Sequence, residues 1–298
     1  MHDDIRIGTL VKADREPANY IRQILPYGFE SFELTFPTDL SGVNLEQIAA
    51  DVRRVLEEHG SGAVISSIGI YGNPLIHEHV AAGFATLVDA AEAFGCKLVC
   101  GFTGRIVDRP IPESLPAFKR VFTPLAQRAE DRGVRIAFEN CDMKGTWDYG
   151  DWNIAHAPTA WEMMFAEVPS PALGLEWEPC HQMVSLVDPL PQLRKWVHKV
   201  FHVHGKDATV MWDVIRTSGI RGGRQYVYHR TPGFGDTNWN DVITILRLGG
   251  FRGSIDIEGW HDPVYRDELE MTGQVRALNY LKECRGGPFV PNPEGAAR

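Results

Sequence analysis

Four short apolar runs in the second half of this 298-residue chain each end in a side chain that can bind a metal ion. In chain order, these side chains are Glu139, Glu178, His204 and Glu258. Each run has the length of a buried strand, and a carboxylate at the end of such a strand is costly to bury unless it is paired or coordinated. Three carboxylates and one imidazole from four strand ends could converge on one divalent cation. The pattern therefore predicts a metal enzyme with these four residues as ligands.

The chemistry that such a centre supports is proton removal next to a carbonyl group. A divalent ion that chelates a carbonyl and an adjacent hydroxyl acidifies the neighbouring C–H bond and stabilises an enediolate. Two carboxylates on opposite faces of the substrate can remove a proton and return it, and Glu139 and Glu258, from non-adjacent strands, are the expected catalytic pair. This chemistry isomerises or epimerises sugars, and it supports β-elimination where a leaving group sits beside the carbanion. The oxygen-rich ligand set suits Mn²⁺, Mg²⁺ or Co²⁺ better than a thiol-preferring ion.

Several side chains close to the four ligands in sequence are expected to contact a substrate. His181 follows Glu178 by three residues and could instead be a fifth ligand, and the segment after Glu258 could instead cap the next helix. Lys206, just beyond the seventh strand, could neutralise a substrate oxyanion, and Asp207 could fix Lys206 or the metal-bound His204. The predicted substrate contacts are His181, Lys206, Trp177, Trp260 and His261.

Two further residues near the ligands have less specific interpretations. His202 lies two positions before His204, so on a strand it points the same way, one layer deeper. We expect it to donate a hydrogen bond to a carboxylate. Cys180 could be a thiolate ligand, but the harder oxygen ligands around it favour a packing role.

The elements that must position these residues alternate between strand and helix. Eight strands are predicted, at residues 5–10, 31–36, 63–68, 97–102, 134–139, 172–177, 200–204 and 253–258, with amphipathic helical segments between them. Such alternation predicts a (β/α)8 TIM barrel, an α/β fold, as a single domain over residues 1–285 with a tail at 286–298. A doubly wound open sheet is the alternative. No GxGxxG follows the first strand, so we expect no nucleotide cofactor.

Two connections, at residues 142–158 and 205–239, are longer than usual and rich in Trp, Tyr and Gly. They follow the fifth and seventh strands, on the face where barrel active sites lie. They could form walls or a lid around an organic substrate, or a subunit interface on the same aromatic side chains. We expect a homo-oligomer, a dimer or a tetramer.

Charge and cysteine content restrict the partners and the compartment. The formal net charge is −9 and there is no run of basic residues, which weighs against a nucleic-acid partner. No apolar stretch approaches a membrane span, and the amino-terminal segment lacks the apolar core of a secretory signal. Five cysteines without a CxxC pair are typical of reduced thiols, so a cytoplasmic location is expected.

Five segments together, IAFEN, EPCH, HVHGKD, PGFGDTNW and IEGWHDP, resemble the sugar phosphate isomerase/epimerase family of the xylose isomerase-like TIM barrel superfamily. The resemblance implies one divalent ion, most often Mn²⁺, with Mg²⁺, Co²⁺ and Zn²⁺ as alternatives. By position, Glu139, Glu178, His204 and Glu258 match the family's ligands. Glu139 and Glu258 match its acid/base pair, and His181 matches a substrate-contacting histidine.

The chain departs from that family in two ways. Glu178 stands where the family usually has Asp, and the stretch between His204 and Glu258 is longer than in the ketohexose epimerases. A small-molecule sugar or glycoside is the expected substrate. The first alternative is a lyase that cleaves 3-keto-O- or C-glycosides, with a small partner subunit if it resembles the C-glycoside deglycosidases. An endonuclease IV-like enzyme would need three zinc ions and a basic face, and a non-catalytic sugar-binding barrel is the last alternative.

Overall fold

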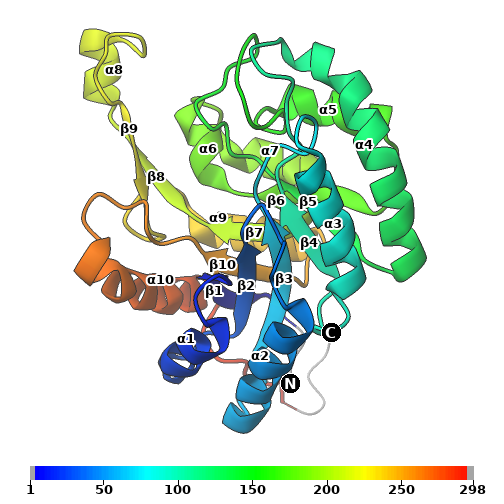
Figure 1. Cartoon of the computed structure of the whole chain (residues 1–298). Coiled ribbons are helices and arrows are strands. Elements are labelled where there is room, and N and C mark those ends of the chain that lie inside the picture. Colours follow the sequence, from blue (N-terminus) through cyan, green and yellow to red (C-terminus); the bar gives the residue numbers. More distant parts are fainter. Residues whose placement is uncertain (1–3, 294–298) are drawn as a thin grey trace.

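The computed structural model describes residues 4–293 and contains a closed barrel of eight parallel strands surrounded by helices (Figure 1). The (β/α)8 prediction is confirmed. Around the barrel the strands run in the order β1-β10-β7-β6-β5-β4-β3-β2, so each strand pairs with the next barrel strand along the chain and β10 closes onto β1. The barrel strands are β1 (Arg6–Lys12), β2 (Ser31–Phe36), β3 (Val64–Ile70), β4 (Leu98–Gly101), β5 (Arg135–Glu139), β6 (Leu173–Trp177), β7 (Val200–Gly205) and β10 (Ser254–Ile257).

Amphipathic helices cover the outside of the barrel. In α2, Asn44 caps the first turn by accepting a hydrogen bond from the Gln47 backbone N–H, and Gly60 ends the helix with φ of 67°. The helices of the outer layer are α1 (Pro17–Ile24), α2 (Leu45–His59), α3 (Glu78–Ala90), α4 (Ile111–Arg132), α5 (Pro158–Glu167), α7 (Pro189–Trp196), α9 (Trp239–Leu248) and α10 (Glu270–Cys284). No helix in the described part of the chain is long and apolar enough to cross a membrane.

The alternation of side chains along each barrel strand separates an apolar outer core from a polar interior. In β6, Leu173, Leu175 and Trp177 belong to the main hydrophobic core, whereas the intervening Glu176 contacts His204 of β7 inside the barrel. All five residues of β6 are buried, as expected for a parallel sheet covered on both faces. The barrel interior thus holds ionisable groups directly beneath the carboxyl ends of the strands.

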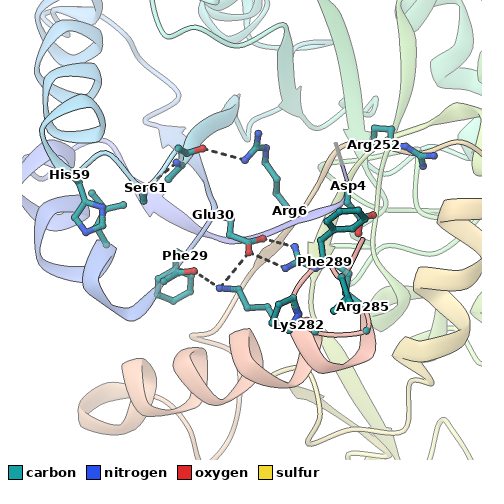
Figure 2. Close-up of a pocket in the computed structure, with 18 of the residues that line it drawn as sticks. Asp4, Arg6, Phe29, Glu30, His59, Ser61, Arg252, Lys282, Arg285 and Phe289 are labelled. Atoms are coloured by element: carbon teal, nitrogen blue, oxygen red, sulfur yellow. Dashed lines mark hydrogen bonds and ion pairs between the residues drawn. The ribbon is translucent and has the colours of Figure 1, made fainter. Parts of the chain in front are cut away.

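The opposite, amino-terminal end of the barrel is closed by ion pairs (Figure 2). Arg285 donates to both carboxylate oxygens of Glu30, at 2.6 and 3.0 Å, and to the Ile5 carbonyl at 2.7 Å. Lys282 donates to the Gly28 carbonyl at 2.6 Å. A cleft of about 960 Å³ lies here, with Phe289 of the tail in its lining. Because the active sites of these barrels lie at the carboxyl-terminal face, we assign the contacts at this end to stability. Residues 294–298 of the predicted tail lie outside the described residues.

Both long connections are present, and the second contains structure that the sequence did not reveal. Strands β8 (Asp207–Val210) and β9 (Val227–Arg230) form an antiparallel hairpin outside the barrel, and α8 (Trp212–Ser218) lies at its tip. The connection after β5 is held by the buried guanidinium of Arg105, which donates to the carbonyls of Thr146 at 2.6 Å and Trp147 at 3.0 Å. The connection after β5 and the β8–β9 hairpin, both of which the sequence places in irregular loops, are therefore ordered at the carboxyl end of the barrel.

Candidate active site

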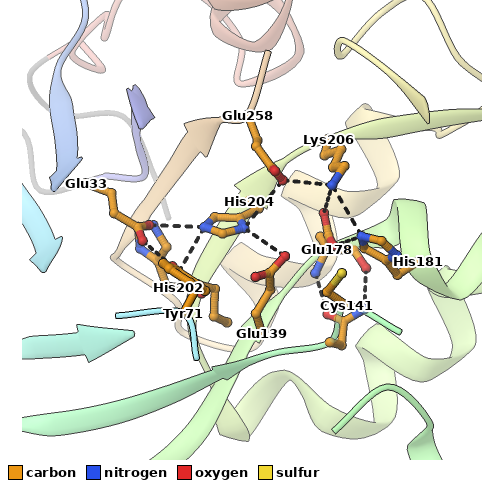
Figure 3. Close-up of polar contacts among 12 residues, drawn as sticks. Glu33, Tyr71, Glu139, Cys141, Glu178, His181, His202, His204, Lys206 and Glu258 are labelled. Carbon is orange, nitrogen blue, oxygen red and sulfur yellow. Dashed lines mark hydrogen bonds and ion pairs between the residues drawn. The ribbon is translucent and has the colours of Figure 1, made fainter. Parts of the chain in front are cut away.

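The four residues predicted as metal ligands lie together at the carboxyl end of the barrel (Figure 3). Glu139 ends β5, His204 lies near the end of β7, and Glu178 and Glu258 directly follow β6 and β10. Each side chain contributes one possible ligand atom, and these four atoms all lie within 4.8 Å of one another. All four residues are buried. The closed barrel produces this convergence because parallel strands end at the same rim.

The chemistry of these four side chains fits a divalent cation. The Nδ1 atom of His204 is buried without a hydrogen bond from any described residue, and the buried oxygens of Glu178 and Glu258 have only ion pairs, with His181 Nε2 at 2.9 Å and Lys206 Nζ at 3.0 Å. His204 Nδ1 lies 3.7 Å from Glu139 Oε1 and 3.8 Å from Glu258 Oε2. Ions such as Mg²⁺ and Zn²⁺ bind these donors at about 2.1 Å, which separates neighbouring donors by roughly 3.0–3.4 Å. Small movements would therefore bring these donors to one cation, and His204 Nδ1, which otherwise costs about 1–3 kcal/mol as an unsatisfied buried atom, would gain a partner.

Lys206 supplies positive charge on one side of this carboxylate group. Its Nζ lies 3.0 Å from Glu258 Oε2, 3.8 Å from Glu178 Oε2 and 3.3 Å from His181 Nε2. Burial alone would lower the pKa of Lys206, but Glu178 and Glu258 raise it well above its usual value. The ammonium group is therefore charged at neutral pH and faces the site.

The two carboxylates predicted to transfer protons have different environments. Burial and the charges of Glu178 and Glu258 raise the pKa of Glu139 to about 7, against the opposing effect of His204. Burial also opposes ionisation of Glu258, but Lys206 and His261 hold its pKa well below the usual value. Two carboxyl groups that act as an acid/base pair require pKa values that differ in this way. A bound cation would lower the pKa of both groups.

His181 connects the site to the long connection after β5. It lies in the short helix α6 (Pro179–Val184), with Nε2 2.9 Å from Glu178 Oε1 and Nδ1 3.0 Å from Asp142 Oδ1. Glu139, Cys141, Glu178 and His181 also form a group with metal-ligand spacing, so both roles predicted for His181 fit its position. Cys180 packs with Met183, Ala208 and Val227, consistent with the packing role.

The outer wall of the site is made by residues after β10 and by the hairpin. His261 Nε2 lies 2.8 Å from Glu258 Oε1, and its side chain is 41% exposed. Trp260 is half-buried with its ring 5.6 Å from that of His261. His229 of β9, which the sequence did not suggest, has its ring 5.1 Å from that of His181 and 5.8 Å from that of His261. Asp262 caps the following turn, accepting from the Val264 and Tyr265 backbone N–H groups.

Two expectations about individual residues are corrected by the structure. Trp177 does not line the site: it is fully buried in the main core, and its indole N–H donates to Gln182 Oε1 at 2.9 Å. Because successive side chains of a strand point to opposite faces, Trp177, between Glu176 and Glu178, points outward to the helices. Asp207 was expected to fix Lys206 or His204, but its hydrogen bonds go to other residues.

Asp207 instead fixes the base of the hairpin. It accepts hydrogen bonds from the Thr237 backbone N–H at 3.0 Å and the Trp239 indole at 3.1 Å. A Cβ at Gly235 would lie 2.4 Å from Asp207 Oδ1, so this turn requires glycine there. The PGFGDTNW segment therefore wraps around Asp207 and hydrogen-bonds its carboxylate.

A layer of buried polar groups beneath the site orients His204. Its Nε2 atom lies 3.1 Å from Glu33 Oε2 and 3.0 Å from Glu176 Oε1. His202 Nε2 is 3.0 Å from the same oxygen of Glu33, so it faces a carboxylate as predicted. Tyr71 donates to Glu33 and lies 2.8 Å from Glu176 Oε2. These contacts direct the Nδ1 atom of His204 toward the cluster.

The carboxylates of this layer were not found from the sequence. Glu176 lies two residues before Glu178, on the same side of its strand, and Glu33 sits in the middle of β2 between two core residues. A charged residue at an inward position of a central strand is the signal that could have identified both.

Comparison with known proteins shows what the chain is similar to. An inosose dehydratase of Clostridium botulinum is 24% identical over 165 residues, which cover 53% of this chain and 51% of that protein. An inosose dehydratase of Clostridium perfringens is 31% identical over 107 residues, 35% of each chain. The similarity thus spans about half of the first relative's length and about a third of the second's.

Solved structures share the whole barrel. A 3-keto-D-glucoside 4-epimerase from E. coli superimposes with a TM-score of 0.69 at 16% identity, covering 94% of this chain and 100% of the other. A xylose isomerase domain protein from Planctomyces limnophilus gives 0.71 at 16% identity, covering 95% and 98%. At these identities the likeness concerns the fold. The family model for the xylose isomerase-like TIM barrel matches residues 21–284, so the chain belongs to the xylose isomerase-like TIM barrel family.

Proposed function

We propose that this chain is a divalent-metal-dependent enzyme that removes a proton from the carbon next to a carbonyl group of a sugar or cyclitol, acting as an isomerase or epimerase. The observation that carries the proposal is the pair of buried carboxylates, Glu139 and Glu258, on either side of His204 Nδ1 at 3.7 and 3.8 Å. Carboxylates so placed can reach a small substrate from two directions. The names of the relatives, epimerase and dehydratase, support the same first step.

The proposed ligands are Glu139, Glu178, His204 and Glu258, and Mn²⁺ is the proposed ion, with Mg²⁺, Co²⁺ and Zn²⁺ as alternatives. A bound divalent cation would supply the positive charge that stabilises the two oxygens of an enediolate. Glu178 Oε1 is paired with His181 Nε2 at 2.9 Å, whereas Oε2 lies 3.8 Å from Lys206 Nζ, so Oε2 is the oxygen most available to a cation.

The remaining residues would bind and orient the substrate. Lys206, charged and buried beside Glu258, would contact a hydroxyl or oxyanion of the substrate. His181 would hold a second oxygen, oriented by Asp142. Trp260 and His261 would form the wall that faces solvent. Glu139 and Glu258 would exchange the proton at the reacting carbon, one as base and the other as acid.

A lyase is the second candidate, and two observations favour it. The matched curated relatives are named inosose dehydratases. Lys206, 3.0 Å from Glu258, is positioned to donate a proton to an oxygen that leaves from the carbon beside the carbanion. The substrate would then be an inosose-like cyclitol ketone or a 3-keto-glycoside, and elimination would follow the same proton removal.

Deuterium exchange separates these candidates. The metal-loaded protein is incubated in D2O with a free ketohexose, a 3-keto-glucoside and an inosose, and each mixture is followed by proton NMR. An isomerase or epimerase gives a deuterated isomer, whereas a lyase gives an unsaturated or dehydrated product. Absence of exchange with all three substrates, in protein shown to contain the metal, would contradict proton abstraction as the function for these substrate classes.

A further inference from the structure

The hairpin between β7 and α9 extends away from the barrel and ends in a segment with few contacts to the rest of the chain (Figure 1). We call residues 211–226, which include α8, the arm. None of the seven residues of α8 is buried. Because isolated helices much shorter than about 12 residues are unstable in water, a helix of this length needs a packing surface. Residues 4–293 of the same chain do not supply one, since none of them packs on α8 closely enough to bury any of its side chains.

The tip of the arm is apolar and basic. Trp212 and Ile220 are 52% and 50% exposed. Arg216, Arg221 and Arg224 are exposed, and none of the three forms an ion pair with any residue from 4 to 293. With Asp213 as the one acidic residue, the arm has a formal charge of +2. Such a combination of Trp and Arg is typical of interface centres.

A surface of opposite charge and similar aromatic content lies on the same face of the same chain. We call residues 141–158 the acidic loop, since three aspartates and one lysine give it a formal charge of −2. Trp147, Tyr149 and Trp152 are 36%, 57% and 39% exposed. Asp148 and Asp151 are exposed, and neither carboxylate lies within ion-pair distance of a cation among the described residues.

The acidic loop is also a rigid target. Arg105 holds it through the Thr146 and Trp147 carbonyls, and Asn153 donates to the Glu139 and Cys141 carbonyls at 2.8 Å each. A loop fixed in this way loses little conformational entropy when it is covered. The arm and the acidic loop follow different strands, β7 and β5, and they do not pair with each other within one chain.

We propose that the arm of one molecule docks on the acidic loop of a second copy, forming a two-fold symmetric dimer. In such a dimer each molecule offers both surfaces, so the same contact forms twice. The three arginines face Asp148 and Asp151 of the partner, and Trp212 and Ile220 cover aromatic side chains of its acidic loop. Both surfaces lie at the carboxyl end of the barrel, so each arm covers the rim of the partner's site.

The proposal accounts for the unusual length of the connection between His204 and Glu258. The base of the hairpin carries His229 over His181 and His261, and it begins directly after Lys206. Docking the tip therefore fixes the strands that form the outer wall of the site. The interface is independent of the proposed reaction, because it uses no residue that would hold the metal or transfer a proton.

Charge reversal on the two surfaces tests the proposal. One variant carries Arg216→Glu, Arg221→Glu and Arg224→Glu in the arm, and the other carries Asp148→Arg and Asp151→Arg in the acidic loop. In each variant alone, like charges face each other across both contacts. We expect the mass measured by light scattering to fall to half that of wild type, with a dimer Kd raised roughly 100-fold or more.

Mixing the two variants provides the rescue. In a mixed dimer, the glutamates of one arm face the arginines of the other loop, and the second contact has its native charges. A mixed dimer should therefore form at concentrations where neither variant associates alone. As a matched control, Arg120→Glu with Arg194→Glu changes two exposed arginines outside both surfaces and should leave the mass unchanged. Circular dichroism verifies that each variant is folded.

Three results would overturn the proposal. The first is a wild-type protein that stays monomeric at tens of micromolar and low salt. The second is either charge-reversal variant keeping the wild-type mass. The third is a mixture of the folded variants that stays unassociated, which would show that the two surfaces do not meet.

Discussion

Replacing Glu33 by Gln removes a carboxylate that does not belong to the proposed metal site but touches His204. Glu33 Oε2 lies 3.1 Å from His204 Nε2, and Glu176 Oε1 lies 3.0 Å from the same atom. A carboxylate partner fixes the imidazole orientation and raises the basicity of its other nitrogen, and loss of such partners typically costs 10–100-fold in metal affinity. Because Glu176 remains in the Glu33→Gln variant, we expect a loss near tenfold, or about 1.4 kcal/mol. The double variant with Glu176→Gln should lose about 100-fold.

The assay is titration of metal-stripped protein with Mn²⁺ in competition with a chelating dye, together with the visible absorption spectrum of the Co²⁺-loaded protein. The spectrum reports the ligand field, which a purely structural defect would leave unchanged. Glu30→Gln is the control, since Glu30 is also a carboxylate paired with a basic side chain, although only partly buried, and it lies at the other end of the barrel. It should lose stability and keep its metal affinity. A folded Glu33→Gln protein with wild-type Mn²⁺ affinity and Co²⁺ spectrum would refute the reasoning.

Three further predictions concern single residues. Glu139→Gln and Glu258→Gln should fold normally and lose turnover by about 10²–10⁴-fold each, measured as deuterium exchange, because each removes a proton-transfer group; near-wild-type exchange would place the base elsewhere. Glu178→Asp should keep the charge but retract the carboxylate, weakening the metal less than Glu178→Ala does in the same titration, and unchanged affinity in the alanine variant would remove Glu178 from the ligands. Burial opposes the ionisation of Glu30, but Arg285 and the Ile7 N–H lower its pKa below the usual 4.5. The ionised Glu30 therefore contributes fully to the free energy of unfolding above pH 4.5, and this contribution is lost as the pH falls through the lowered pKa. Urea unfolding of Glu30→Gln should therefore show a deficit of about 1–3 kcal/mol at pH 7 that shrinks below pH 4.5, and a deficit independent of pH would contradict the assignment.

The barrel and the four converging residues could be predicted from the sequence because both depend on local patterns. Each strand is a short apolar run, each helix has an amphipathic repeat, and parallel strands place their carboxyl ends on one rim. Glu139, Glu178, His204 and Glu258 therefore came together once the strands were assigned.

The remaining features depend on which way a side chain points or on contacts between distant segments. Trp177 was misplaced because its neighbours in sequence face the site while it faces the helices. Glu33 meets His204 across 171 residues, a contact that no local pattern encodes. The β8–β9 hairpin was missed because its strands are four residues each and are separated by the glycine-rich arm.

The central claim is that Glu139, Glu178, His204 and Glu258 hold one divalent cation. Crystals of the protein purified with Mn²⁺, measured with X-rays above and below the manganese absorption edge, test it most directly. The claim predicts one anomalous peak per chain within about 2.0–2.6 Å of His204 Nδ1 and of oxygens from all three glutamates. A manganese-loaded protein whose anomalous map shows no peak among these four side chains, or a peak bound by other residues, would contradict it.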